Sequence, residues 1–213
     1  ALFTNCQNNP SANADKTAAD TVAADVKIEG VWVNKAWWET LESTKSPRKA
    51  AEKLGIAGVT IQQDSTGKWL GVVNYAFHEG GEYELKPVEG GNFQLLETEG
   101  KTKQHDLTVL SDSTLRIDSF DLVRFGDLQM DDTDFTAGIV SGTYSLKGKP
   151  GDVIFYSNGS VSGLEGYESY DVVLDYVVDE VGADEIMLIK PGDERDFYAF
   201  VIKGNQLLLS MVD

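Results

Sequence analysis

The chain has 213 residues, 41% of them hydrophobic and 25% charged, an ordinary globular composition that is long enough to bury a large core. Eighteen basic residues stand against 35 acidic ones, so the formal net charge is −17. An electric field of that sign repels phosphate backbones and anionic lipid headgroups, which excludes nucleic acid as an expected partner, and no run of about 18 apolar residues is present to predict a membrane-spanning helix.

Residues 1–25 contain few large apolar groups and are predicted to be a disordered tether. The single cysteine, Cys6, excludes a disulfide within the chain and a thiolate metal site. A short apolar start, then Cys6, then a polar stretch resembles the end of a bacterial lipoprotein signal, although Asn5 stands where these signals usually have Gly, Ala or Ser. The resemblance implies a lipid anchor at Cys6, the only membrane attachment expected, and a location at the outer membrane of the cell envelope, on its periplasmic or surface face. The alternative is a chance cysteine in a flexible terminus.

A first β repeat is expected over residues 26–125, with a helical insertion at 35–54. Residues 26–33 are rich in β-branched side chains and partly alternate, which indicates a strand. From residue 56 onward, alternating apolar and polar residues separated by glycine-containing turns predict an antiparallel meander. Its strands are expected at 59–63, 68–77, 82–86, 92–98, 106–110 and 114–117, and the apolar stretch 120–125 is compatible with either a strand or a turn.

The insertion is predicted to hold two short helices. The first covers about 35–42, with Asn34 as a possible N-cap. The second covers 47–54, because the Ser46 hydroxyl can accept from an exposed first-turn N–H and Pro47 has no N–H to leave unpaired.

An acidic connector is expected over residues 126–141. It contains the densest group of oxygen ligands in the chain: Asp127, Asp131, Asp132 and Asp134. Calcium takes about six to eight oxygens, and this loop could supply about half of them, but the spacing does not match an EF-hand loop. The other interpretation is a solvated acidic linker, and no metal site is predicted.

A second β repeat is expected over residues 142–213. Gly142-Thr143-Tyr144 opens it as Gly30-Val31-Trp32 opens the first, and similar hairpins follow. The helical insertion has no counterpart here. We interpret the two regions as a diverged internal duplication that forms one domain or two. The alternative is that two unrelated meanders share the same turn residues.

The Gly-x-Trp start, the short helical segment and the meander resemble the lipocalin and calycin-like group. The lipocalin-like lipoproteins of Bacteroidetes, whose domains begin with Gly-x-Trp or Gly-x-Tyr, are the most similar. The residues that carry the resemblance are Gly30, Trp32, Gly142 and Tyr144. It implies an all-β fold, either one lipocalin-like barrel or two half-barrels or sheets from the duplication. It also implies that Trp32 and Tyr144 close the barrel and that the interior holds a small ligand.

No catalytic motif is recognisable. The two histidines, His78 and His105, are assigned to different turn regions, and no Gly-x-Ser-x-Gly or His-Glu-x-x-His pattern is present. With 35 acidic residues, pairs of carboxylates are unavoidable by chance, and none stands out. The sequence therefore predicts a protein that is not an enzyme and needs no cofactor.

Aromatic residues are the best candidates for a ligand site. Trp37 and Trp38 are adjacent on a helix, so both cannot face one core, and Tyr167 and Tyr170 flank a loop in the second half. Stacking on such rings holds carbohydrate and lipophilic ligands. With Arg48, these residues are the predicted rim of a cavity, and core packing is the alternative interpretation.

These observations predict a non-enzymatic envelope lipoprotein that binds a small hydrophobic or glycan-like ligand. The alternative is a structural or protein–protein interaction module of a cell-envelope complex.

Overall fold

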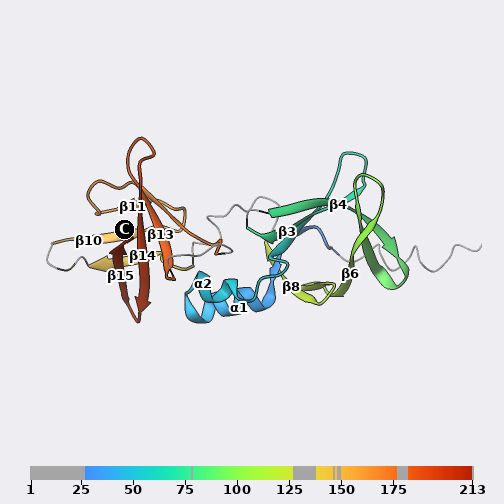
Figure 1. The fold of residues 1–213 in the computed structure, drawn as a ribbon, viewed down its shortest axis with the longest axis horizontal. Helices are drawn as coiled ribbons and strands as arrows, with labels where there is room; N and C mark the ends of the chain where they lie inside the picture. Colours follow the sequence, from blue (N-terminus) through green and yellow to red (C-terminus); the bar gives the residue numbers. More distant parts are fainter. Residues whose placement is uncertain are drawn as a thin grey trace, which may run out of the picture.

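The computed structural model of the chain describes residues 27–77, 79–126, 138–145, 147, 150–176 and 182–212. Cys6, His78 and the Asp127–Asp134 group, and with them the predicted lipid anchor and calcium loop, lie outside the described residues. Two β bodies lie at opposite ends of the molecule, with two short helices between them (Figure 1).

The first body is a closed antiparallel barrel in which each strand pairs with the next and the last pairs with the first. A short 3-10 turn, η2 (Glu89–Gly91), links β4 to β5. This confirms the predicted all-β meander with a short helical insertion after its first strand, and the ambiguous stretch near residue 120 is a strand. The strands are β1 (Gly30–Asn34), β2 (Gly58–Gln63), β3 (Trp69–Ala76), β4 (Glu79–Val88), β5 (Asn92–Glu97), β6 (Lys103–Ser111), β7 (Thr114–Ile117) and β8 (Phe120–Gly126).

Side chains fill the interior of this barrel. Alternate residues of a strand point to one face, so each strand contributes every second residue to the inside. The fully buried members form one hydrophobic cluster that includes Trp32, Ile61, Leu95, Leu107, Leu115, Ile117 and Leu122. The interior of the first barrel is therefore a packed hydrophobic core and not a ligand cavity.

Helices α1 (Lys35–Thr44) and α2 (Pro47–Ala51) begin at the predicted caps. The Asn34 side chain accepts a hydrogen bond from the backbone N–H of Trp37 at 3.1 Å, and the Ser46 hydroxyl accepts one from Lys49 at 3.2 Å. The second helix ends at Ala51, three residues before the predicted end, because the chain tightens there into i→i+3 turns.

The second body is also built of antiparallel neighbours, but its first and last strands do not pair with each other in the described part of the chain. Its two sheets have the orders β11-β10-β9 and β12-β13-β14-β15, and they are joined by a bridge between Ser160 and Ser169. The result is a second antiparallel meander, with seven strands among the described residues. They are β9 (Gly142–Ser145), β10 (Asp152–Phe155), β11 (Val161–Ser162), β12 (Ser169–Val172), β13 (Asp184–Ile189), β14 (Arg195–Lys203) and β15 (Gln206–Met211).

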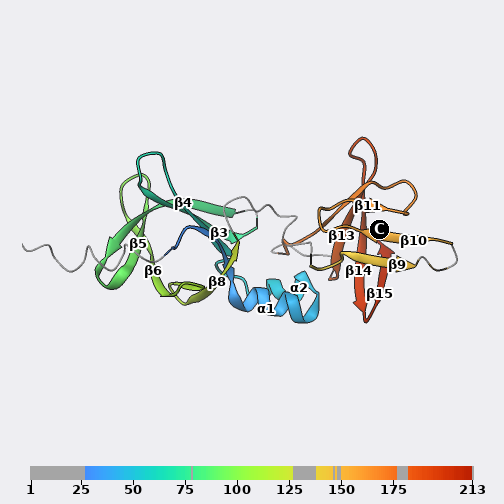
Figure 2. The same ribbon diagram turned by 180° about the vertical axis from the view of Figure 1, so that it is seen from behind.

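The helical insertion joins the two bodies, as both ribbon views show (Figures 1 and 2). Trp37, Leu41 and Ala50 are buried in a cluster whose other members come mainly from the second body. Asp184, the first residue of β13, accepts hydrogen bonds from the Ser46 hydroxyl (2.9 Å) and from the backbone N–H of the residue after Pro47 (2.8 Å). The insertion therefore belongs to the packing of both halves.

Candidate functional site

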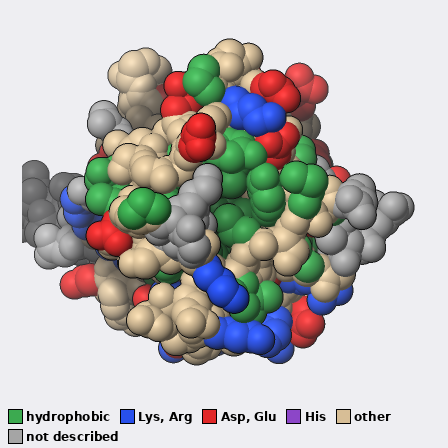
Figure 3. Space-filling view, turned by 90° about the vertical axis from the view of Figure 1, so that its left-hand side faces the viewer, with side chains coloured by type: hydrophobic (Ala, Val, Ile, Leu, Met, Phe, Trp, Pro, Cys, Tyr) green, Lys and Arg blue, Asp and Glu red, His purple; other side chains and the backbone are tan. Residues whose placement is uncertain are grey.

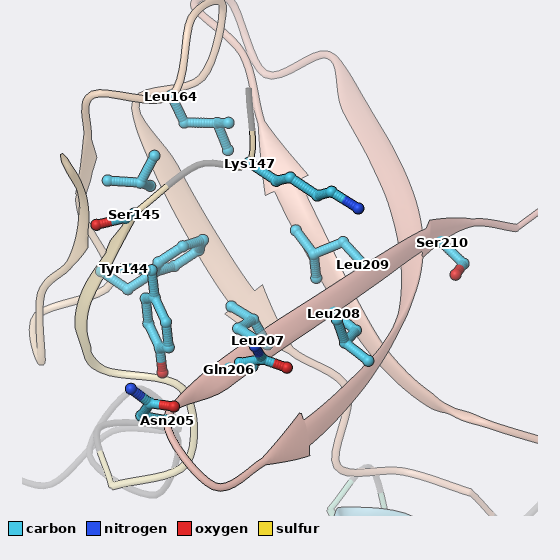
Figure 4. Close-up of a pocket in the computed structure, with 12 residues that line it drawn as sticks. Tyr144, Ser145, Lys147, Leu164, Asn205, Gln206, Leu207, Leu208, Leu209 and Ser210 are labelled. Carbon is cyan, nitrogen blue, oxygen red and sulfur yellow. The ribbon is translucent and has the colours of Figure 1, made fainter. Parts of the chain in front are cut away.

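A cavity of about 610 Å³ opens between β9 and β15 in the second body. Figure 4 shows its lining side chains, with Tyr144 and Ser145 on one wall and the β15 residues on the other. The full lining is Tyr144, Ser145, Lys147, Val153, Phe155, Leu164 and the six residues from Asn205 to Ser210. Cavities of about 300–1,000 Å³ are the usual size for binding a small ligand.

The cavity lies where the second meander has no closing strand among the described residues. Within the described part of the chain, β9 pairs only with β10 and β15 pairs only with β14. In the first barrel, β8 pairs with both β7 and β1 and so closes the sheet. The two unpaired edges therefore face each other across the opening.

The orientation of the β15 backbone follows from its hairpin. Two residues, Gly204 (φ +60°) and Asn205, connect β14 to β15, and the flanking residues Lys203 and Gln206 are directly opposite each other. In a two-residue hairpin that flanking pair exchanges hydrogen bonds, and the bonding then alternates along the ladder. The N–H and C=O groups of residues 207, 209 and 211 therefore point away from β14, toward the gap.

The walls of the cavity are apolar and its rim is polar. Val153, Phe155, Leu207 and Leu209 belong to the same cluster as the second-body core or pack against it. The rim carries serine and amide side chains and Lys147, which extends across the opening toward β15 (Figure 4). Seen end-on from the second body, hydrophobic side chains gather in the middle of the face (Figure 3). This arrangement suits an apolar guest with polar ends.

Tyr144 stands at the edge of the cavity in a fixed orientation. Its hydroxyl donates to the backbone carbonyl of Val140 at 3.0 Å, and its ring meets Phe155 edge-on at 5.8 Å. Burial raises the pKa of the Tyr144 phenol, so the hydroxyl stays protonated and acts as a donor. The side chain is only half-buried because no strand covers its outer side among the described residues.

A polar cluster extends from the interior of the first barrel to its surface and corrects one sequence expectation. His105 is not in a turn: it lies on β6 and points toward the interior, because its neighbour two positions on, Leu107, is a core residue. The imidazole Nε2 is 2.7 Å from the Tyr75 hydroxyl, and Nδ1 is 2.7 Å from the Asp118 carboxylate. Tyr75 also shares a 2.6 Å hydrogen bond with Tyr83.

This chain of carboxylate, imidazole and phenol has the order of a nucleophile-activating triad, but its electrostatics oppose that use. Burial, followed by the hydrogen bond with Tyr83, raises the pKa of the Tyr75 hydroxyl far above its ordinary value. A phenol held so firmly in its protonated form is a poor nucleophile or base. The cluster ties β3, β4, β6 and the β7–β8 turn together.

The residues that the sequence predicted as the rim of a cavity do not lie beside this cavity. They lie in the hydrophobic core of the second body or near it. Trp37 is fully buried and Trp38 packs edge-on against Phe125 at 4.7 Å. The Tyr167 hydroxyl donates to Asp196 at 2.6 Å, and the buried Tyr170 donates to the carbonyl of residue 156 at 2.7 Å. Arg48 is exposed near the N-terminus of α2.

The structure therefore brings Trp37, Trp38, Tyr167 and Tyr170 into one cluster, but neither they nor Arg48 line the cavity. A ligand role for them stays a prediction. Trp32 lies buried in the first barrel, and Tyr144 lines the cavity.

Sequence reasoning missed Leu207, Leu209 and Lys147 as site residues. The sequence pattern marks residues 207–212 as a strand but carries no signal that this strand lines a cavity, because that depends on the strand order.

No family, no curated protein and no solved structure matches this chain. Among the described residues, no helix has the length and apolar character needed to span a bilayer. Those residues also contain no group of three or more His, Cys, Asp or Glu side chains placed to hold a metal ion.

Proposed function

We propose that this chain is a non-enzymatic binding protein of lipocalin-like construction, and that it binds a hydrophobic guest between β9 and β15. The observation that carries the proposal is the cavity of about 610 Å³, whose walls expose the apolar core of the second body. Burying apolar surface yields about 25 cal/mol per Å², so an exposed core wall is a strong attraction for an apolar guest.

The two bodies have different parts in this proposal. The first barrel is closed and filled by its own side chains, so it serves as a scaffold. The second body is open between β9 and β15 in the part of the chain that the structure describes, and it carries the proposed site. The helical insertion fixes one to the other through the shared cluster and the bonds to Asp184.

The location in the cell is a proposal from the sequence alone. The setting of Cys6 supports a lipid anchor, and the Gly-x-Trp and Gly-x-Tyr starts support a lipoprotein of the Bacteroidetes lipocalin-like type. A tethered binding protein at the outer membrane would present its cavity to the periplasm or to the surroundings of the cell.

The proposal is tested by titrating the full chain with N-phenyl-1-naphthylamine, an uncharged probe that fluoresces in apolar sites. Saturable binding at one site per chain is expected. Leu209→Gln places an amide in the cavity wall and should weaken binding, whereas Leu110→Gln makes the same change at an exposed position on β6 of the first barrel and should not. Circular dichroism checks that both variants are folded. Absence of saturable binding to the wild type, or equal binding by both variants, would refute the proposal.

A further inference from the structure

We infer that the guest of this site is an extended segment of another protein, which enters between β15 and β9 as the eighth strand of the second body. The inference rests on the proposed function, since it names the class of guest for the same cavity. The partner strand would run antiparallel to both edges, as β8 runs antiparallel to β7 and β1.

The first barrel shows how an eighth strand closes such a meander. Its eighth strand, β8, places Leu122 in the core and pairs residue by residue with β7 on one side and β1 on the other. The second body repeats the order of antiparallel neighbours from β9 to β15 and stops one strand short within the described residues. The cavity lies at the position that β8 fills in the first barrel.

The unpaired backbone groups at the edge of β15 favour a polypeptide guest over a lipid. Residues 207, 209 and 211 direct backbone N–H and C=O groups into the gap, and an acyl chain can satisfy none of them. A strand edge of this kind pairs readily with another extended chain, and peptide recognition by strand addition uses the same groups. β15 is six residues long, which sets the length of the segment it can pair with.

The side-chain pattern of the guest also follows from β8. Inward-facing apolar residues at every second position would cover Val153, Phe155, Leu207 and Leu209. In the first barrel, the Arg124 guanidinium lies 4.5 Å from the Trp32 ring centroid. An Arg in the guest would stack on Tyr144 in the same way. The net charge of −17 also favours a basic segment.

Apolar residues beside the free edge extend the surface that a partner would cover. Phe197, Val201 and Leu208 are 44%, 48% and 45% exposed on the outer face of β14 and β15. Val201 and Leu208 are directly opposite each other in the ladder. Apolar side chains that form a contiguous exposed patch, unlike isolated ones, are typical of surfaces that contact another protein.

The test uses the full chain and a peptide with the sequence of residues 120–126, Phe-Asp-Leu-Val-Arg-Phe-Gly, which is the chain's own closing strand. The peptide should bind at one site per chain and displace N-phenyl-1-naphthylamine. It should also slow hydrogen exchange at the amides of residues 207, 209 and 211. Two control peptides are a scrambled version without alternation and a version methylated on alternate backbone nitrogens. Both should bind at least about tenfold more weakly, since they lose the apolar face or the edge hydrogen bonds.

Each other outcome overturns the inference. If the fluorescent probe binds but the peptide does not displace it, the guest is a small molecule, and the proposed function stands while the inference fails. If the methylated peptide binds as well as the unmodified one, strand pairing is refuted. If residues 207, 209 and 211 are protected without peptide in a concentration-dependent dimer, the guest is a second copy of this chain. If neither the probe nor the peptide binds, both proposals fail.

Discussion

The indole of Trp32 and the phenol of Tyr144 are anchored in the same way in the two halves of the chain. Each ring donates a hydrogen bond to the backbone carbonyl of the residue four positions earlier, at 2.8 Å for Trp32 and 3.0 Å for Tyr144. Each follows a glycine at position −2 with a positive φ, +137° at Gly30 and +155° at Gly142. Residues with a side chain rarely adopt a positive φ, so glycine is required at both positions. The shared construction supports the proposed duplication.

The two rings differ in what covers them, and this difference predicts different costs of truncation. Trp32 is 1% exposed, whereas Tyr144 is half-buried at the edge of the cavity. Trp32→Ala should therefore cost about 3–5 kcal/mol of unfolding free energy, the usual range for a buried aromatic residue. Tyr144→Ala should cost less, about 1–2 kcal/mol, because less surface and one hydrogen bond are lost. Chemical denaturation measures both, and equal costs would show that Tyr144 is covered in solution.

Arg124 should prove to be a structural residue of the first barrel. Its guanidinium lies over the Trp32 ring and donates to the carbonyl oxygens of Glu29 (2.8 Å) and Lys27. Arg124→Met keeps much of the aliphatic length but removes these bonds, and should cost about 2 kcal/mol.

Arg116→Met is the matched control for Arg124. Arg116 pairs with Asp121 on the exposed outer face, where solvent screens the ion pair, so its replacement should change stability little. Thermal or chemical denaturation of the two variants gives the comparison. A control variant as destabilised as Arg124→Met would contradict the assignment.

The Ser46–Asp184 contact should couple the helical insertion to the second body. Ser46→Ala removes the N-cap of α2 and the 2.9 Å bond to Asp184, so we expect a cost of about 1–2 kcal/mol, toward the upper part of the range for a cap. Asp184→Ala and the double variant complete a mutant cycle. A coupling energy above about 0.5 kcal/mol would show that the two side chains act together, and additive costs would show that the cap is purely local.

The parts of the fold that could be predicted from the sequence are those set by interactions between neighbouring residues. Asn34, Ser46 and Pro47 define helix starts with neighbouring residues only, and strand alternation needs only two-residue spacing, so these elements were predictable. Barrel closure depends on β8 meeting β1, a contact between distant segments that no local pattern encodes. His105 was misassigned for a related reason. It sits among polar residues just before the predicted strand start at residue 106, whereas β6 begins three residues earlier, at Lys103.

The candidate site was less predictable than the fold. Trp37 and Trp38 stand out in the sequence because large aromatic residues are rare, but the same size makes them good core residues, and they pack between the two bodies. The cavity depends on the absence of a pairing between β9 and β15 among the described residues. Such a feature has no motif of its own, and it emerges only when the strand order is known.

The lipid anchor predicts membrane retention in a host that processes lipoproteins. Cys6→Ala removes the thiol that would receive the lipid, so the protein should move from the membrane fraction to the soluble fraction. Fractionation followed by immunoblotting measures the shift, and Cys6→Ser is a second thiol-free variant. Unchanged retention of both variants would remove the lipoprotein proposal and leave the binding site unaffected.

The His105–Asp118 pair predicts a specific acid sensitivity of the first barrel. Burial alone would raise the pKa of Asp118, but hydrogen bonds from the His105 ring and the Asp106 backbone N–H hold it below its ordinary value of 3.8. A carboxyl with a lowered folded-state pKa stabilises the fold above its unfolded pKa, and this contribution is lost as the pH falls through the folded-state value. The loss should therefore appear below about pH 4.

Asp118→Asn cannot titrate, so its unfolding free energy should be lower than that of the wild type at pH 6, and the difference between them should shrink toward pH 2. Urea denaturation across this range measures the difference, with Asp112→Asn, an exposed loop position, as the control. A constant offset between wild type and Asp118→Asn at every pH would contradict the role assigned to the hydrogen-bonded carboxylate.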